Sequence, residues 1–235
     1  MLILAIIAMN SCKKDEPPAP PTFEELLTGG AGDANGKTWV LSKGVYPSDD
    51  GGGAVTNDMF ALLQIPENIQ TLLGREYDNE FTFFSDGKYS INPVNDTVLA
   101  ATLSSSLAGI VCDWTQNELG LCGAHFAAVT NATWTLHTED FMVDAISNPL
   151  DAATPPTHGN VTFTGKNWLS FSTGAYFGIL DVTTSTHVII KEVTETEMHV
   201  ALLVCMYQGV MNPGGLEFAA LPTHIFQLTY VPKAE

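Results

Sequence analysis

Histidines and carboxylates are the side chains of this sequence with the chemistry to bind metals or transfer protons. The six histidines stand at positions 125, 137, 158, 187, 199 and 224, and no two have the HxxxH or HxH spacing of a metal-binding pair. The G-x-S-x-G and P-loop motifs are absent, and the acids show no arrangement that singles out a catalytic pair. The sequence therefore predicts a protein that is not an enzyme and that holds neither a metal nor a cofactor.

One cysteine stands near the start of the chain, directly after an apolar run. Cys12 follows MLILAIIA and the small polar pair Asn10-Ser11, which is where a lipoprotein signal peptidase would cut before the cysteine is acylated. We expect residues 1–11 to be the end of a secretory signal that begins upstream of this run, and Cys12 to carry the lipid. The alternative is an ordinary cleaved signal with an incidental cysteine.

The other three cysteines belong to the body of the chain. Cys112 and Cys122 are ten residues apart, and export to an oxidising compartment would let a disulfide between them hold the intervening loop. Cys205 lies in an apolar segment, so we expect a buried thiol there.

The loop between Cys112 and Cys122 would present an aromatic ring among polar side chains. Trp114 lies in it beside Asp113, Gln116 and Asn117. Sugars stack on aromatic rings while amides and carboxylates hydrogen-bond their hydroxyls, so these residues are candidate glycan contacts. The alternative is that this loop packs onto the end of the β structure. A weaker candidate contact is Tyr46.

The charge balance excludes one class of partner. The chain has 26 acidic residues against 9 basic ones, a formal net charge of −17. Such a surface repels phosphate backbones, so we expect no nucleic acid partner. Hydrophobic residues make up 45% of the chain and charged residues 15%, which is typical of a globular domain and not of a disordered chain.

Alternation of apolar and polar residues predicts the strands that must position these side chains. Strands are expected at 38–41, 80–84, 88–91, 132–137, 160–164, 167–172, 175–180, 186–193, 198–205 and 224–231. Hairpin turns are expected at Ser85-Asp86-Gly87 and at residues 194–197. The tryptophans at 39, 134 and 168 fall on such strands and are expected in the core.

Helical signals appear between the strands. The stretch from Thr22 to Glu25 fits a capping box, and Gly29-Gly30 would end the helix that it opens. Residues 58–74 and 96–108 are expected as helical insertions across one end of the β structure, and residues 109–130 as an excursion of the same kind. Because no βαβ alternation appears, we predict an all-β fold, a barrel or a β-sandwich of about 8 to 10 antiparallel strands.

The chain divides into three parts. Residues 1–11 are the signal remnant, residues 12–21 hold the lipidated cysteine and a proline-rich tether, and residues 22–235 form a single β domain. Prolines at 17, 18, 20 and 21 keep the tether extended and semi-rigid, since proline lacks the backbone donor and fixes φ. Such a tether would hold the domain off the membrane.

Several stretches resemble Bacteroidota lipoproteins. SCKKDE at 11–16 resembles the starts of such proteins, in which a charged stretch after the lipidated cysteine goes with export to the cell surface. The order of LLTGGAGDANGKTWVLSKG (26–44), NEFTFFSDGKYSINP (79–93), NWLSFSTGAYFGIL (167–180) and HVIIKEVTETEMHVAL (187–202) resembles a group of surface lipoproteins with lipocalin-like or jelly-roll β domains. Members often accompany outer-membrane glycan import machinery. Asp96-Thr97-Val98 also matches the pattern that Bacteroidota use for O-glycosylation, which makes Thr97 a candidate site.

The resemblance implies a lipocalin-like barrel or sandwich, lipid-anchored in the outer membrane and facing the cell surface. We expect a non-catalytic lipoprotein that binds a polysaccharide or serves as an accessory of an outer-membrane uptake complex. Alternatives are a lipocalin-like carrier of a small apolar ligand and a structural subunit of a membrane complex. The sequence departs from the group after the first strand (VYPSDDGGGAVTNDMFALLQ) and in the cysteine-bearing excursion. Both departures fall in loops, where binding resides, so a family ligand is not carried over.

Overall fold

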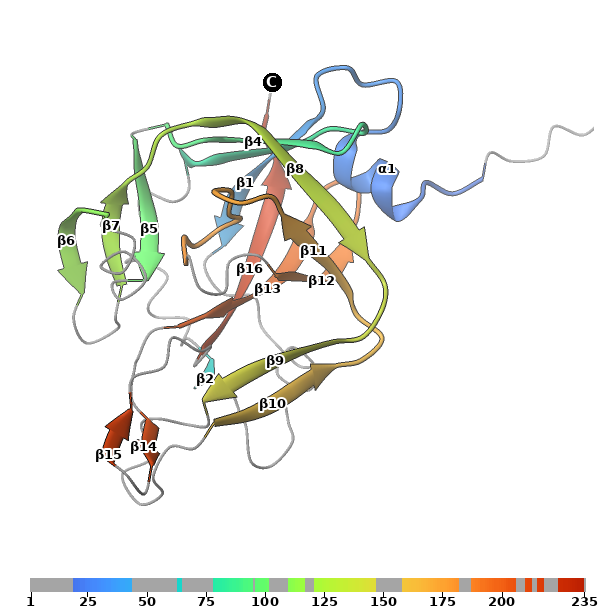
Figure 1. Ribbon diagram of the computed structural model, residues 1–235. Coiled ribbons are helices and arrows are strands. Elements are labelled where there is room, and N and C mark those ends of the chain that lie inside the picture. The colour runs from blue at the N-terminus through green and yellow to red at the C-terminus, as the bar shows by residue number, and fades with distance from the viewer. Residues whose placement is uncertain are drawn as a thin grey trace, which may run out of the picture.

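Among the residues that the structure describes, eight antiparallel strands close into a barrel (Figure 1). In order around the barrel they are β1 (Lys37–Lys43), β3 (Glu80–Phe83), β4 (Lys88–Asn92), β8 (Val129–His137), β11 (Asn167–Phe171), β12 (Val188–Val193), β13 (Met198–Val204) and β16 (His224–Pro232). Pairing of β1 with β16 closes the ring. The predicted all-β fold is confirmed, and of the two predicted architectures the chain adopts the lipocalin-like barrel.

This computed structural model describes most of the domain. The described residues are 19–43, 63–64, 78–94, 96–101, 110–116, 121–146, 158–181, 187–205, 210–212, 215–217 and 224–234. No helix in these segments is long and apolar enough to cross a membrane.

Alternating side chains give each barrel strand an inward and an outward face. On β3, Phe81 and Phe83 are buried in the barrel, while Thr82 between them is partly covered. The predicted hairpin to β4 is confirmed, and Gly87 in its turn has a φ of 83°, a value that favours glycine. The second predicted hairpin, between β12 and β13, is also confirmed.

The strands run up and down, so successive connections alternate between the two ends of the barrel. The β3–β4 and β12–β13 turns lie at the end where the helix α1 (Phe23–Thr28) leads into β1. Nζ of Lys37 donates to the carbonyl oxygens of Leu26 and Glu195 at this end. These bonds tie the helix, the first strand and the β12–β13 turn together.

The helix α1 packs on that end of the barrel. Its predicted capping box is confirmed, because Oγ1 of Thr22 accepts from the backbone N–H of Glu25 and the Glu25 carboxylate accepts from the N–H of Thr22. Gly29, with a φ of 83°, ends the helix as expected. Leu27 is fully buried, and its carbonyl accepts from Nε1 of Trp39 at 2.9 Å. Both the cap and the barrel therefore hold this short helix in place.

The connection between β11 and β12 enters the barrel interior. Its residues 175–181, which we call the plug, are all buried. The ring centroid of Phe177 lies 4.5 Å from that of Tyr230. Gly178 has a φ of 73°, and a Cβ at this position would lie 2.6 Å from Cδ1 of Leu202. The plug therefore fills space that a hollow barrel would leave to a ligand.

The strand predicted at residues 175–180 is wrong. Its spacing of aromatic residues fits a strand, but the surrounding barrel buries these residues on every side instead of on one face. Oη of Tyr89 donates to the carbonyl of Tyr176 at 2.7 Å, and the N–H of Leu180 donates to the carbonyl of Leu99. Hydrogen bonds to neighbouring segments thus satisfy backbone groups of the plug that a β ladder would otherwise pair.

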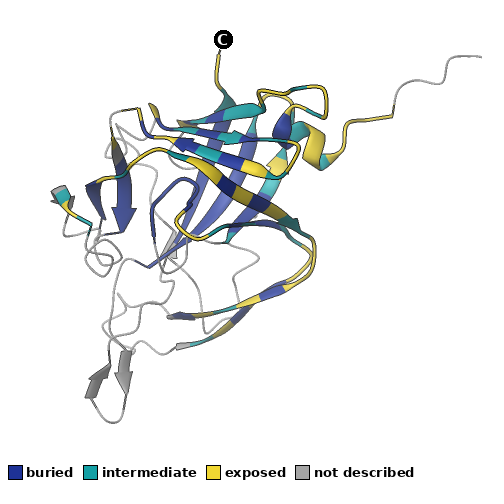
Figure 2. Ribbon diagram, turned by 45° about the horizontal axis from the view of Figure 1, so that its top comes forward, coloured by how far each residue is buried: buried dark blue, intermediate teal, exposed yellow. Residues whose placement is uncertain are grey.

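The described segments contain two clusters of buried apolar side chains. Buried positions are dark blue on the ribbon in Figure 2. The interior core fills the barrel around the plug. The outer core lies outside the barrel wall, under a ribbon of β9 (Phe141–Ile146) paired with β10 (His158–Phe163). Its members are Phe141, Ala145, Val161 and Phe163 of the ribbon and Trp168, Ile189, Ala201, Leu203 and Ile225 of the wall. Trp39 and Trp134 belong to the interior core and Trp168 to the outer one, so the prediction that all three are buried is confirmed.

Segments expected as helical insertions contain β structure. β5 (Thr97–Ala101), β7 (Leu121–His125) and β6 (Cys112–Gln116) form a sheet that follows β4 in the chain. The helix predicted at 96–108 is wrong at its start, since a continuous apolar run such as 98–101 does not distinguish a helix from a buried strand. Of the insertion at 58–74, Leu63–Gln64 forms β2, parallel to β16, and the rest lies outside the described residues. β14 (Val210–Asn212) pairs with β15 (Gly215–Glu217).

Candidate functional site

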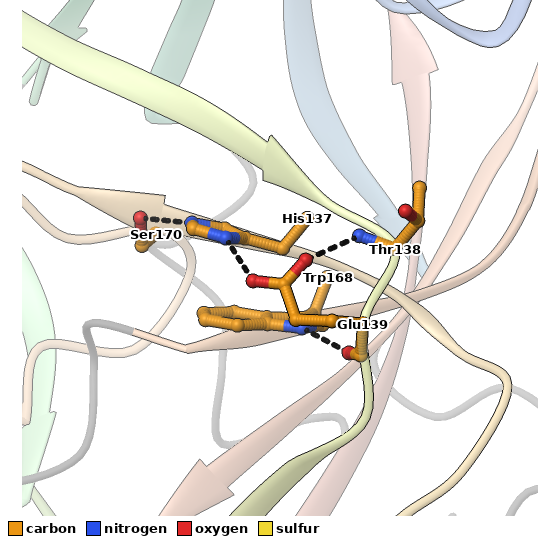
Figure 3. Close-up of polar contacts among 5 residues, drawn as sticks. All are labelled: His137, Thr138, Glu139, Trp168 and Ser170. Atoms are coloured by element: carbon orange, nitrogen blue, oxygen red, sulfur yellow. Dashed lines mark hydrogen bonds and ion pairs between the residues drawn. The ribbon is translucent and has the colours of Figure 1, made fainter.

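A chain of hydrogen bonds joins three polar side chains on the outer wall of the barrel (Figure 3). Nε2 of His137 lies 2.8 Å from Oγ of Ser170, and Nδ1 lies 2.8 Å from Oε1 of Glu139. The serine and the carboxylate thus occupy opposite edges of one imidazole ring. We call Ser170, His137 and Glu139 the relay.

The register of β8 and β11 brings the relay together. His137 is the last residue of β8 and lies opposite Trp168, while Ser170 lies opposite Thr135. Residues two apart on a strand share a face, and diagonal neighbours across a ladder are within reach of long side chains. His137 therefore reaches Ser170 along the outer face of the barrel, and Glu139 follows two residues after the end of the strand.

The indole of Trp168 holds the imidazole of His137 by stacking. The two ring centroids lie 3.8 Å apart with an interplanar angle of 9°. Nε1 of Trp168 donates to the backbone carbonyl of Glu139 at 3.0 Å, and the N–H of Thr138 donates to the Glu139 carboxylate at 3.1 Å. Trp168 is itself packed against Phe141 in the outer core. The ring and the carboxylate of the relay are thus fixed in orientation.

The carboxylate determines where His137 carries its proton. Hydrogen bonds from its own backbone N–H and from the His137 side chain lower the pKa of Glu139, so this carboxylate is ionised at neutral pH. An ionised carboxylate can only accept, and Nδ1 of His137 must therefore donate to it. In the neutral imidazole Nε2 is then the acceptor, and Oγ of Ser170 donates to Nε2.

A second histidine belongs to the same aromatic stack. The ring centroid of His187 lies 5.0 Å from that of Trp168 and 5.6 Å from that of Phe141. Burial lowers the pKa of His187, and the proximity of His137 lowers it further. His187 is therefore neutral at pH 7 in the folded protein.

A groove of about 460 Å³ lies between α1 and the end of β8. It is lined by Glu24 and Glu25 of α1, by Ser85 of the β3–β4 turn and by Trp134 and Thr135 of β8, among others. Because Thr135 lies opposite Ser170 in the ladder, the groove and the relay are neighbours on the barrel wall. Hydroxyl and carboxylate groups of this kind can exchange hydrogen bonds with a polyhydroxylated ligand.

The two cysteines predicted to be bonded are joined in the structure. The disulfide between Cys112 and Cys122 links β6 to β7, which confirms the prediction. The stretch expected as a loop is therefore largely a β ladder, and Asp113, Trp114 and Gln116 lie on its strand β6. Their role as glycan contacts stays a prediction.

The remaining predicted residues lie away from the relay or outside the described residues. Cys12, Tyr46 and Asn117 belong to segments that the structure does not describe. Thr97 is the first residue of β5 and lies opposite His125. Cys205 is a buried thiol, as predicted, and its backbone N–H donates to Oδ2 of Asp181 at 2.6 Å. Within the described segments no group of three or more His, Cys, Asp or Glu residues could hold a metal ion.

The sequence did not predict the relay. His137 and Glu139 are two residues apart, but Ser170 is 33 residues from His137, and the β8–β11 register alone joins them. One signal was present in the sequence: His137 and Ser170 both stand on polar positions of alternating strands, which places them outside a barrel.

No known family model matches the chain, and neither does any curated protein.

Proposed function

We propose that the protein is anchored by lipid in the outer membrane, faces the cell surface and binds glycan there. The apolar start before Cys12, the SCKKDE stretch and the proline-rich tether support the location. That the protein is not an enzyme stays a prediction from the sequence.

The observation that carries glycan binding is the composition of the groove beside α1. Two acidic residues, Glu24 and Glu25, and the hydroxyl-bearing residues Ser85 and Thr135 line it together with Trp134. The helix is held by its cap and by the barrel, so the groove exists before a ligand arrives and little ordering entropy opposes binding. Its acidic wall and the net charge of −17 favour a neutral glycan over an anionic one.

The alternative of a carrier for a small apolar ligand has less support. Such a carrier needs an internal cavity, and the plug occupies the interior of this barrel. A role as accessory or structural subunit of an outer-membrane complex is a second candidate, based on the resemblance of the sequence. For that role, pull-down from solubilised membranes should recover a partner in stoichiometric amounts.

Affinity electrophoresis against a panel of neutral and anionic polysaccharides tests glycan binding. We expect a neutral polysaccharide to retard the purified protein. The double variant Glu24→Gln/Thr135→Val should weaken that binding at least tenfold, because hydrogen bonds to a charged group contribute about 1.5–3 kcal/mol. The matched control is Glu192→Gln/Thr162→Val, which changes the same residue types at exposed positions on β12 and β10.

Two results would contradict this proposal in different ways. If no polysaccharide retards the wild-type protein, glycan binding is wrong. If Trp114→Ala abolishes retardation while the groove variant retains it, the binding site lies at β6, beside the Cys112–Cys122 disulfide, and not in the groove.

A further inference from the structure

We propose that the relay is a nucleophile–base–acid site at which Ser170 hydrolyses small acyl esters. This activity goes beyond glycan binding and does not depend on it. It also departs from the expectation, drawn from missing sequence motifs, that the protein is not an enzyme.

The three groups of the relay stand in the order hydroxyl, imidazole, carboxylate. A hydroxyl lies at Nε2 and a carboxylate at Nδ1 of the same imidazole, each at 2.8 Å. Serine hydrolases of unrelated folds share this arrangement, which is recognised by geometry and not by the order of residues in the chain. Because Glu139 fixes the proton on Nδ1, Nε2 of His137 is available to take the proton of the serine hydroxyl.

The imidazole of His137, the base of the relay, is held rigidly. Stacking on Trp168 at 3.8 Å fixes the plane of the His137 ring, and Trp168 in turn is fixed by its bond to the carbonyl of Glu139 and by the outer core. The face of an indole also attracts the imidazolium that forms when the base is protonated. Catalytic groups need such support, because a loosely held base rarely adopts the productive geometry.

The relay is open to solvent. The side chain of His137 is 24% exposed and that of Glu139 is 63% exposed, so a substrate can reach the relay from solvent. Thr135, opposite Ser170 in the ladder, is exposed and places a second hydroxyl on the same face. A hydroxyl in that position can donate to the oxygen of an ester carbonyl as negative charge develops on it.

The proposed reaction balances without a metal or an oxidant. Oγ of Ser170 forms a bond to the carbonyl carbon of the ester while Nε2 of His137 takes the hydroxyl proton. The bond from that carbon to the leaving oxygen then breaks, and His137 returns its proton to the leaving alcohol. Water next gives a proton to His137 and attacks the acyl-serine, whose bond to Oγ breaks as Oγ regains a proton. The products are the free acid and the alcohol.

The neighbouring groove indicates the class of ester. Its hydroxyls and carboxylates suit a polyhydroxylated alcohol, so an O-acylated sugar is the substrate class that fits best. The choice of an O-acylated sugar alone rests on the proposed glycan binding. A fluorophosphonate probe and p-nitrophenyl acetate test the hydrolytic activity without it.

The test uses the purified full chain and a fluorophosphonate probe, which reacts covalently with activated serines. We expect the probe to label the wild-type protein at Ser170, as located by mass spectrometry of peptides, and Ser170→Ala to lose the label. The matched control is Ser172→Ala on the next outward position, because Oγ of Ser172 accepts from the backbone N–H of Thr133 and not from an imidazole. That variant should label like the wild type.

Hydrolysis of p-nitrophenyl acetate supplies a second readout. We expect Ser170→Ala and His137→Gln each to lower kcat/KM at least about 100-fold, since a positioned general base contributes roughly 10²–10⁴-fold. Glu139→Gln should lower kcat more than it changes KM, because it disturbs the proton position on His137 and not ester binding.

Three results would overturn the proposal. The first is a folded wild-type protein, verified by circular dichroism, that takes no label at Ser170. The second is labelling of Ser170→Ala equal to the wild type. The third is an unchanged rate of ester hydrolysis in Ser170→Ala, which would show that histidines act directly on the ester. A Ser170→Ala variant that still binds polysaccharide would separate the fate of this proposal from that of glycan binding.

Discussion

The interior core and the outer core of this barrel are both apolar, yet they differ in what closes them. The interior core is surrounded by eight strands and filled by the plug, and the side-chain hydroxyl of the buried Tyr89 donates there to the backbone carbonyl of Tyr176. The outer core is covered by one two-stranded ribbon, and histidines stand along its edge at 137 and 187. A core enclosed on all sides contributes stability, whereas a core with an open edge can hold titratable groups in fixed positions near solvent.

Phe177→Ala tests the interior core where it should matter most. The Phe177 ring is buried among the rings of Phe81, Phe83 and Tyr230, and its loss leaves a cavity at the centre of the barrel. We expect the free energy of unfolding in urea to fall by about 3–5 kcal/mol. A fall below about 1 kcal/mol would show that the plug does not stabilise the barrel.

Gly178→Ala tests how tightly the plug fits. A Cβ at Gly178 would lie 2.6 Å from Cδ1 of Leu202 and 2.7 Å from Oη of Tyr230, and the φ of 73° adds backbone strain. We expect the free energy of unfolding to fall by about 2–4 kcal/mol, from overpacking and backbone strain together. Gly174→Ala is the control, since its φ is 84° but no atom lies within 4 Å of the added Cβ. Equal losses in the two variants would mean that strain alone acts and that the plug is not tightly packed.

The same substitution, valine to alanine, can be made in both cores. Val200 faces the interior and Val161 lies in the outer core, and both are buried. We expect Val200→Ala to cost about 2 kcal/mol and Val161→Ala about 1 kcal/mol, because two methyl groups are lost in each and the ribbon can shift to close its cavity. Hydrogen exchange should rise across the barrel in the first variant and on β9 and β10 in the second. A larger loss of unfolding free energy in Val161→Ala than in Val200→Ala would contradict the distinction between the two cores.

Acidification should lower the free energy of unfolding through the outer core. We expect this to be the smallest of the effects on stability. The lowered pKa of His187 means that the unfolded chain, with an ordinary value of 6.5, binds a proton more readily than the folded protein does. The stabilisation by neutral His187 is therefore complete above about pH 6.5 and is lost as the pH falls below that value. His187→Gln should flatten the dependence of the unfolding free energy on pH between about 7.5 and about 5.5. A variant with the same slope as the wild type would show that His187 is not responsible.

Much of the barrel was predictable because its signals are local. The capping box at Thr22, the turn glycine at 87 and the alternation of Phe81 with Phe83 each depend on residues a few positions apart. The disulfide was predictable from the ten-residue spacing of its cysteines together with an exported chain. Ribbon strand β9 was missed, and β5 was mistaken for a helix because its buried run has no alternation.

The sequence by itself determined that this chain forms antiparallel strands with buried aromatic faces and an exposed acidic surface, because period-two patterns, caps and charge act over short distances. Only the tertiary structure decided that β1 meets β16, that residues 175–181 fill the barrel, and that Ser170 meets His137. Each of these outcomes depends on strand register or on enclosed space. Register and space follow from contacts between residues far apart in the chain, and no local pattern specifies them.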